Sequence, residues 1–116
     1  MDERLKQALD FSNYRQTLTA QRKQLKEKID AKLTYGYNGG IFKIDKSLIN
    51  FVRLLIDKGR IEEVPLLDSN DNPILVKDMN QFEEEILDRY FTAVYEYYEQ
   101  HENLKKSRSV EKLLDI

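Results

Sequence analysis

The chain has a long stretch without glycine or proline at each end, and these two stretches limit what it can fold into. In the first, apolar residues recur over 11–33 at steps of three, four or seven, which is the period of an amphipathic helix. They are Phe11, Tyr14, Leu18, Leu25, Ile29 and Leu33. The stripe carries about two residues per heptad and is interrupted at Gln21 and Arg22. It predicts a coiled-coil seam against one neighbouring helix.

The second stretch begins at Asp78, which has Gln81 three residues later in the spacing of a capping box. A helix is predicted from here to about Lys106. One of its faces carries Phe82, Ile86, Tyr90, Val94, Tyr97, His101 and Leu104. An adjoining stripe carries Phe91, Tyr95 and Tyr98. Together they make an unusually wide apolar surface for one helix.

Turn-forming residues between these stretches predict two short β-hairpins. Asn38-Gly39 lies between aromatic and β-branched residues, and this pair favours the positive φ angles of a primed two-residue turn. The cluster of turn formers 68–73 predicts a second turn, with strands over 61–67 and 74–77. Pro65 indicates that one of these strands is an edge.

A third helix is predicted between the hairpins, over 46–58. Asp45 can accept a hydrogen bond from its first free amides, and Gly59 can end it in the left-handed conformation. Its apolar residues cover most of the circumference, which a helix contacted on several sides can bury. They are Leu48, Ile49, Phe51, Val52, Leu54, Leu55 and Ile56. The predicted fold is α+β and predominantly α, with two long amphipathic helices and a buried central helix with two short β-hairpins.

The length of 116 residues fits one domain, expected here over residues 1–106. The segment 107–116 is expected to be a C-terminal docking tail, because 110–116 is too short for a stable helix alone and is apolar at one-turn spacing. The chain has no cysteine, its first residues lack the apolar core of a signal peptide, and no apolar run approaches the ~20 residues that span a bilayer. A cytoplasmic protein that does not enter membranes is expected.

The net charge of −2 hides an asymmetry between the two halves of the chain. Residues 1–60 carry 13 Lys/Arg against 7 Asp/Glu, a balance of +6, and residues 61–116 carry 6 against 14, a balance of −8. The two long helices are therefore expected to attract each other. Pairing within one chain and pairing between two chains satisfy the seam and the charges alike.

The residues that usually carry chemistry are scarce. His101, the only histidine, lies on the apolar face of the last helix, where packing is its expected role, and zinc sites usually need three or four His or Cys ligands. The glycines match no phosphate-binding spacing. The segment 68–72 begins like a calcium loop, but Pro73 replaces the glycine of the sharp bend and Met79 the bidentate carboxylate. We expect no catalytic residue, metal, cofactor or small-molecule substrate, and no enzyme.

Binding to a macromolecule is the remaining class of function. The basic residues of the first half, with Tyr35, Tyr37 and Phe42 to stack on bases, are typical of nucleic-acid-binding proteins. Against this, the basic residues of the first helix are spread around its circumference and the acidic half would repel phosphates. They are Arg15, Arg22, Lys23, Lys26, Lys28 and Lys32, with Lys43, Lys46, Arg53, Lys58 and Arg60 after the helix. A nucleic-acid-binding accessory factor is the alternative to a protein-binding one.

Two apolar segments are the candidate partner-binding surfaces. The aromatic stripe is either core beneath the hairpins or, if exposed, a contact site, because Tyr and Phe are enriched at interface centres. The C-terminal segment mixes leucines with acids, like short peptides that dock into grooves, and self-docking fits equally. The candidate residues are Phe91, Tyr95, Tyr98, Leu113, Leu114 and Ile116.

Three stretches of the chain, 35–42, 66–74 and 88–91, resemble small uncharacterised proteins of T4-like tailed phages. They read YGYNGGIF, LLDSNDNPI and DRYF. The resemblance implies a viral context, in which the protein would be a virion or assembly component, or a factor that binds host machinery, in the host cytoplasm or the virion. The sequence as a whole predicts a non-enzymatic structural or adaptor protein that acts through contacts with a protein partner or with itself.

Overall fold

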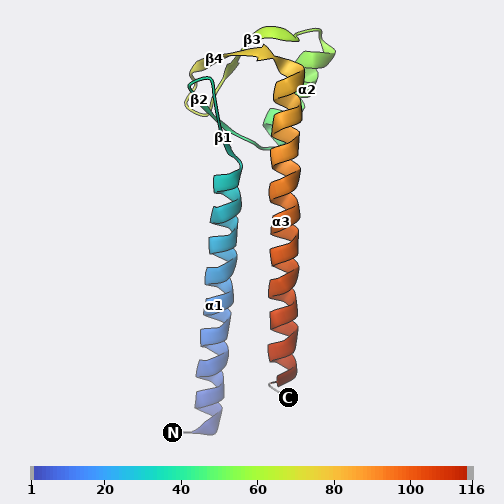
Figure 1. Ribbon diagram of the computed structural model, residues 1–116. Helices are drawn as coiled ribbons and strands as arrows, with labels where there is room; N and C mark the ends of the chain where they lie inside the picture. Colours follow the sequence, from blue (N-terminus) through green and yellow to red (C-terminus); the bar gives the residue numbers. More distant parts are fainter. Residues whose placement is uncertain (1, 115–116) are drawn as a thin grey trace. The chain divides into compact units, whose positions relative to one another are not determined.

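The computed structural model describes the backbone of residues 2–114 and the side chains of residues 2–106. Within these residues, three α-helices and two two-stranded antiparallel hairpins follow one another in the order α1, β1, β2, α2, β3, β4, α3 (Figure 1). The predicted class, α+β and mostly helical, is confirmed. Contacts divide the chain into two compact units. We call Ile29–Tyr95 the hairpin unit, and Met1–Lys28 together with Glu96–Ile116 the helical unit.

The hairpin unit contains the first predicted hairpin, formed by β1 (Thr34–Tyr37) and β2 (Gly40–Lys43). The turn residues Asn38 and Gly39 have φ angles of 48° and 84°. These are the left-handed angles of a type I′ turn, which suits the right-handed twist of the flanking strands. The prediction made from the Asn-Gly pair is confirmed.

The second predicted hairpin is formed by β3 (Glu62–Leu67) and β4 (Pro73–Asp78). Pro65 lies opposite Leu75 of β4. Because proline has no backbone N–H, this position cannot donate a hydrogen bond to another strand placed beside β3. Glu63, two residues earlier, has a φ of 50°, outside the extended region. In this two-stranded sheet β3 is an edge strand, as Pro65 predicted.

A buried carboxylate connects the two hairpins. Asp68, in the loop after β3, accepts hydrogen bonds from the backbone N–H of Ile41 in β2 (3.0 Å) and from those of Asn70 and Asn72 (2.9 Å each). The bond from Ile41, followed by those within the loop, holds the pKa of Asp68 below its ordinary value. Ser69 donates twice to the carbonyl oxygen of Ile41, from its backbone N–H and its hydroxyl. The segment 68–72 therefore joins β2 to the second hairpin.

Helix α2 (Lys46–Asp57) has the predicted ends. The Asp45 carboxylate accepts from the backbone N–H of Leu48 at 2.8 Å, which satisfies one of the free amides of the first turn. Gly59 follows the helix with a φ of 83°, the left-handed conformation that ends many helices.

The prediction that α2 is buried around its circumference is wrong. Val52 and Ile56 are buried, but Phe51 and Leu54 are 50% and 52% exposed. The reason is that only one face of α2 packs against the core of the hairpin unit. The apolar side chains on the other faces of α2 remain in solvent. A half-exposed helix can show an apolar circumference in the sequence.

The core of the hairpin unit is built from both hairpins, α2 and the start of α3. The rings of Phe42 and Phe82 meet edge to face with centroids 5.3 Å apart. Each fully buried side chain of this size contributes about 1.5–3 kcal/mol relative to an exposed one. The most deeply buried members are Phe42, Phe82, Ile44, Met79, Ile86, Val52 and Val76.

Helix α3 (Met79–Leu114) begins as predicted, because Asp78 accepts hydrogen bonds from the backbone N–H groups of Asn80 and Gln81. It continues beyond Lys106, where the sequence predicted its end. No glycine or proline interrupts 107–114, and extending an existing helix needs no new nucleation. The side chains of 107–116 lie outside the described residues. Docking by this tail, like the single domain over 1–106, stays a prediction.

Helix α1 (Glu3–Lys32) begins before the predicted start at 11, because Asp2 accepts a hydrogen bond from the backbone N–H of Arg4 and no breaker follows. In the helical unit its predicted seam is buried at Leu18 and Leu25. Phe11, at the N-terminal end of the seam, is 55% exposed. The seam therefore exists in the middle of α1 and opens toward its N-terminus.

Candidate interaction surfaces

The three aromatic residues predicted to bind a partner are all exposed on α3. Phe91, Tyr95 and Tyr98 expose 52%, 68% and 62% of their surface. The alternative reading, in which they form core beneath the hairpins, does not hold, since the core of the hairpin unit is made of other residues. Phe91 and Tyr95 belong to the hairpin unit, and Tyr98 belongs to the helical unit.

Two exposed carboxylates share the side of α3 that carries Tyr95. At about 100° per residue, Glu84, Asp88 and Tyr95 lie within about 40° of one another around the helix axis. Ile86, about half a turn away from Tyr95, is fully buried, so this side points away from the core of the hairpin unit. We call Glu84, Asp88, Phe91 and Tyr95, all exposed, the acidic–aromatic face.

The run of three glutamates in α3 divides by role. Glu83 accepts a hydrogen bond from Arg53 of α2 at 2.9 Å, and Glu85 accepts one from Arg89 at 2.7 Å. The Arg89 guanidinium also lies 4.3 Å from the ring centroid of Tyr35, a cation–π distance. Glu84 is exposed and has no ion pair among the described side chains. Two of the acids are therefore paired with arginines of the same unit, and the third is available to a partner.

Helix α1 carries an exposed basic surface in the helical unit. The sequence suggested basic residues spread around the helix, but Arg15, Arg22 and Lys26 lie within about 40° of one another at 100° per residue. All three are exposed, and none forms an ion pair with another described side chain. The Arg15 guanidinium lies 5.9 Å from the ring centroid of Phe11. We call Arg15, Arg22 and Lys26 the basic flank.

Sequence reasoning missed a third surface, the outer face of the β3–β4 hairpin. Its inner residues are buried, whereas Leu67 and Leu75 are 64% and 42% exposed and lie opposite or beside the exposed Pro65 and Pro73. The sequence contained a signal for this face. A strand with one solvent-exposed face usually alternates apolar and polar residues, whereas 64–67 is apolar at every position. The hairpin therefore presents a small apolar face to solvent.

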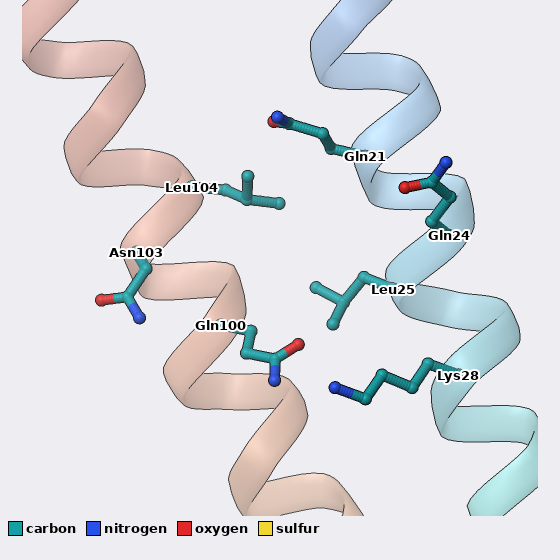
Figure 2. A pocket seen from close by; sticks show the side chains of 7 residues that line it. All are labelled: Gln21, Gln24, Leu25, Lys28, Gln100, Asn103 and Leu104. Carbon is teal, nitrogen blue, oxygen red and sulfur yellow. The ribbon is translucent and has the colours of Figure 1, made fainter.

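The helical unit contains an open hollow of about 300 Å³ between α1 and α3 (Figure 2). Leu25 and Leu104 point toward each other across it, which continues the seam of α1. The rest of the lining is polar and comes from Gln21, Gln24, Lys28, Gln100 and Asn103. An apolar seam edged by amides and one lysine is typical of helix packing, and it places no nucleophile beside a base.

The other residues considered for chemistry have structural contacts. His101 stacks on Tyr97 one turn earlier, with ring centroids 6.0 Å apart, in keeping with the packing role predicted for it. Asp68, which begins the calcium-like segment, directs both carboxylate oxygens at backbone N–H groups. In the part of the chain that the structure describes, no group of three or more His, Cys, Asp or Glu side chains is arranged to hold a metal ion.

The remaining predicted partner residues, Leu113, Leu114 and Ile116, have side chains outside the described residues. Between residues 2 and 114, no helix has the length and apolar character needed to cross a bilayer. No protein-family model matches the chain, and comparisons with curated proteins and with solved structures gave no match. The resemblance to proteins of T4-like tailed phages stays an expectation.

Proposed function

We propose that the protein is a non-enzymatic structural or adaptor protein that acts by binding another protein chain through α3. The observation that carries this proposal is the exposure of Phe91 and Tyr95, at 52% and 68%, in a unit whose core is complete without them. Large aromatic side chains are the residues most enriched at the centres of protein interfaces, because they bury much area for little conformational entropy. The proposal assigns no catalytic step and no cofactor.

The setting of these aromatics supports a protein partner. Glu84 and Asp88 on the same side of α3 would repel a nucleic-acid backbone, whereas they can form a polar rim around an apolar contact with a protein. The exposed outer face of the β3–β4 hairpin adds further apolar surface in the same unit. In the viral context that the sequence resemblance implies, the partner would be a component of the virion or of its assembly, or host machinery.

Site-specific photocrosslinking in lysate of the native host tests this proposal. A photoreactive phenylalanine replaces Tyr95 in one variant and Lys43, an exposed residue of β2, in a matched control. We expect discrete protein adducts from position 95 that exceed those from position 43, with their masses giving the size of the partner. Equal, diffuse labelling from both positions would sink the proposal, and adducts with nucleic acid instead of protein would favour the alternative function.

A further inference from the structure

Two exposed surfaces of opposite charge have matching spacings on different helices. In the basic flank of α1, Arg15 precedes Arg22 by seven residues, and Arg22 precedes Lys26 by four. In the acidic–aromatic face of α3, Glu84 precedes Asp88 by four and Asp88 precedes Tyr95 by seven. The order of the intervals is reversed, so the two series coincide when the helices run antiparallel.

The antiparallel register pairs suitable chemistry at each of the three positions. It places Lys26 against Glu84 and Arg22 against Asp88, two opposite-charge pairs about 6 Å apart along the axis. It places Arg15, the remaining cation, against Tyr95 about 10 Å further on. A guanidinium on an exposed tyrosine ring is a favourable cation–π contact, of the kind that Arg89 already makes with Tyr35. Charge and aromatic contact therefore select the same register.

The geometry points to a second copy of this chain as the occupant: the basic flank of one copy docks antiparallel on the acidic–aromatic face of another. This inference rests on the proposed function, since it names the partner of the aromatic side of α3. Both surfaces are exposed in the described structure, and none of their charges has an ion pair among the described side chains. Each copy thus carries both surfaces, and each surface can bind its counterpart on another copy.

The charges favour this occupant over nucleic acid. Residues 61–116 carry a balance of 6 basic against 14 acidic residues, so a phosphate backbone laid along the basic flank would meet repulsion from the other half of the chain. A second copy turns the same acidic half into an attractive surface. The contact uses different surfaces on the two copies, so it either closes reciprocally in a dimer or continues to a ring or a longer assembly.

Light scattering on the purified full chain, at low and at high salt, is the experiment. The wild-type chain is expected to show a mass of at least two chains at low salt and to dissociate as salt screens the pairs. Arg15→Glu with Arg22→Glu, and separately Glu84→Lys with Asp88→Lys, should each weaken association about tenfold or more. Lys43→Glu with Lys77→Glu, at exposed positions off both surfaces, is the control and should leave the mass unchanged.

The decisive sample is the equimolar mixture of the two charge-reversed variants. Each variant has one reversed and one native surface. In the mixture, the native acidic–aromatic face of the Arg15→Glu, Arg22→Glu variant can bind the native basic flank of the Glu84→Lys, Asp88→Lys variant, so the mixture should regain a mass of at least two chains. Circular dichroism on each variant establishes that it is folded. Recovery in the mixture supports the inference because misfolded or merely destabilised variants would not rescue each other.

The inference is overturned by a wild-type monomer at low salt, by a mixture that stays monomeric, or by an assembly unaffected by both reversals. Retention of labelled duplex DNA by the wild-type chain but not by the Arg15→Glu, Arg22→Glu variant, with no change in mass, would also overturn it in favour of nucleic acid. A purified monomer whose position 95 still crosslinks to a different protein would reject the second copy and leave the proposed function standing.

Discussion

The hairpin unit and the helical unit bury apolar side chains to very different extents. In the hairpin unit, residues from both hairpins, α2 and α3 meet in one cluster that includes the edge-to-face rings of Phe42 and Phe82. Among the side chains described in the helical unit, Leu18 and Leu25 are the buried apolar residues. The first unit is organised like the core of a small domain, and the second like a narrow helix seam.

This difference in burial indicates which unit is more stable and which one leaves more of its surface free for binding. Because stability follows buried apolar area, the hairpin unit should resist unfolding more than the helical unit. A helix that contacts one neighbour through a narrow seam keeps most of its circumference in water. The basic flank of α1 is part of that remaining surface, so the less stable unit supplies one side of the inferred contact.

Phe82→Ala should have the largest effect, because it empties the centre of the hairpin unit. Phe82 is 2% exposed and meets the rings of Phe42 and Tyr37, each at 5.3 Å. Truncation of a buried phenylalanine costs about 3–5 kcal/mol of unfolding free energy. Urea unfolding followed by circular dichroism measures it. The matched control is Phe51→Ala, at a half-exposed phenylalanine of the same unit, with an expected cost of about 0.5 kcal/mol; equal losses would contradict the core described here.

Leu25→Ala tests the seam of the helical unit. Leu25 is 8% exposed, and its loss should cost about 2 kcal/mol, at the low end for a buried leucine because the seam is narrow. Amide hydrogen exchange should accelerate over residues 14–28 while residues 62–86 keep their protection. Leu9→Ala, in an exposed stretch of the same helix, is the control. Equal loss of protection in both units would show that they unfold together, as the single domain predicted over residues 1–106 requires.

Asp68→Asn should have the smallest effect at neutral pH and a distinctive dependence on pH. In the folded protein, bonds from backbone N–H groups hold the pKa of Asp68 below its ordinary value of 3.8. The carboxylate therefore stabilises the fold above the pKa of the unfolded chain, about 3.9, and this stabilisation disappears as the pH falls through the lower folded value. The variant should be less stable than wild type at pH 7, and the two should converge in acid.

The control for this prediction is Asp71→Asn, at an exposed residue of the same loop, which should follow the wild-type curve. Thermal unfolding from about pH 7 to about pH 2 covers the range in which the carboxylate titrates. A constant difference between the Asp68→Asn variant and wild type at every pH would mean that charge plays no part in joining the hairpins.

Local signals predicted most of the fold. Asn38-Gly39 identified the first turn. Asp45 and Gly59 identified the ends of α2, and Asp78 identified the start of α3. Each of these signals acts on backbone groups within a few residues. What they could not give was burial. The apolar circumference of α2 suggested a fully buried helix, yet Phe51 and Leu54 are half exposed, since burial depends on how much surface the rest of the chain supplies.

For the candidate surfaces, the sequence could only offer alternative interpretations. The stripe of Phe91, Tyr95 and Tyr98 was equally consistent with core and with a contact site, and exposure in the folded chain separates the two readings. The calcium-like segment could not reveal that Asp68 accepts a hydrogen bond from the backbone N–H of Ile41, which lies 27 residues earlier in the sequence. The basic flank was hidden because the other cations of α1 lie on other sides of the helix.

The proline and the left-handed glutamate of β3 bear on whether this strand can pair with a strand of another molecule. A short strand with exposed apolar residues, here Pro65 and Leu67, is a hazard for aggregation if its edge can pair with the same strand of another molecule. Pro65 removes the central donor from that edge, and the φ of 50° at Glu63 turns the strand away from the flat geometry that a growing fibril needs. Two copies of this chain are thus less prone to pair backbone to backbone along the β3 edge.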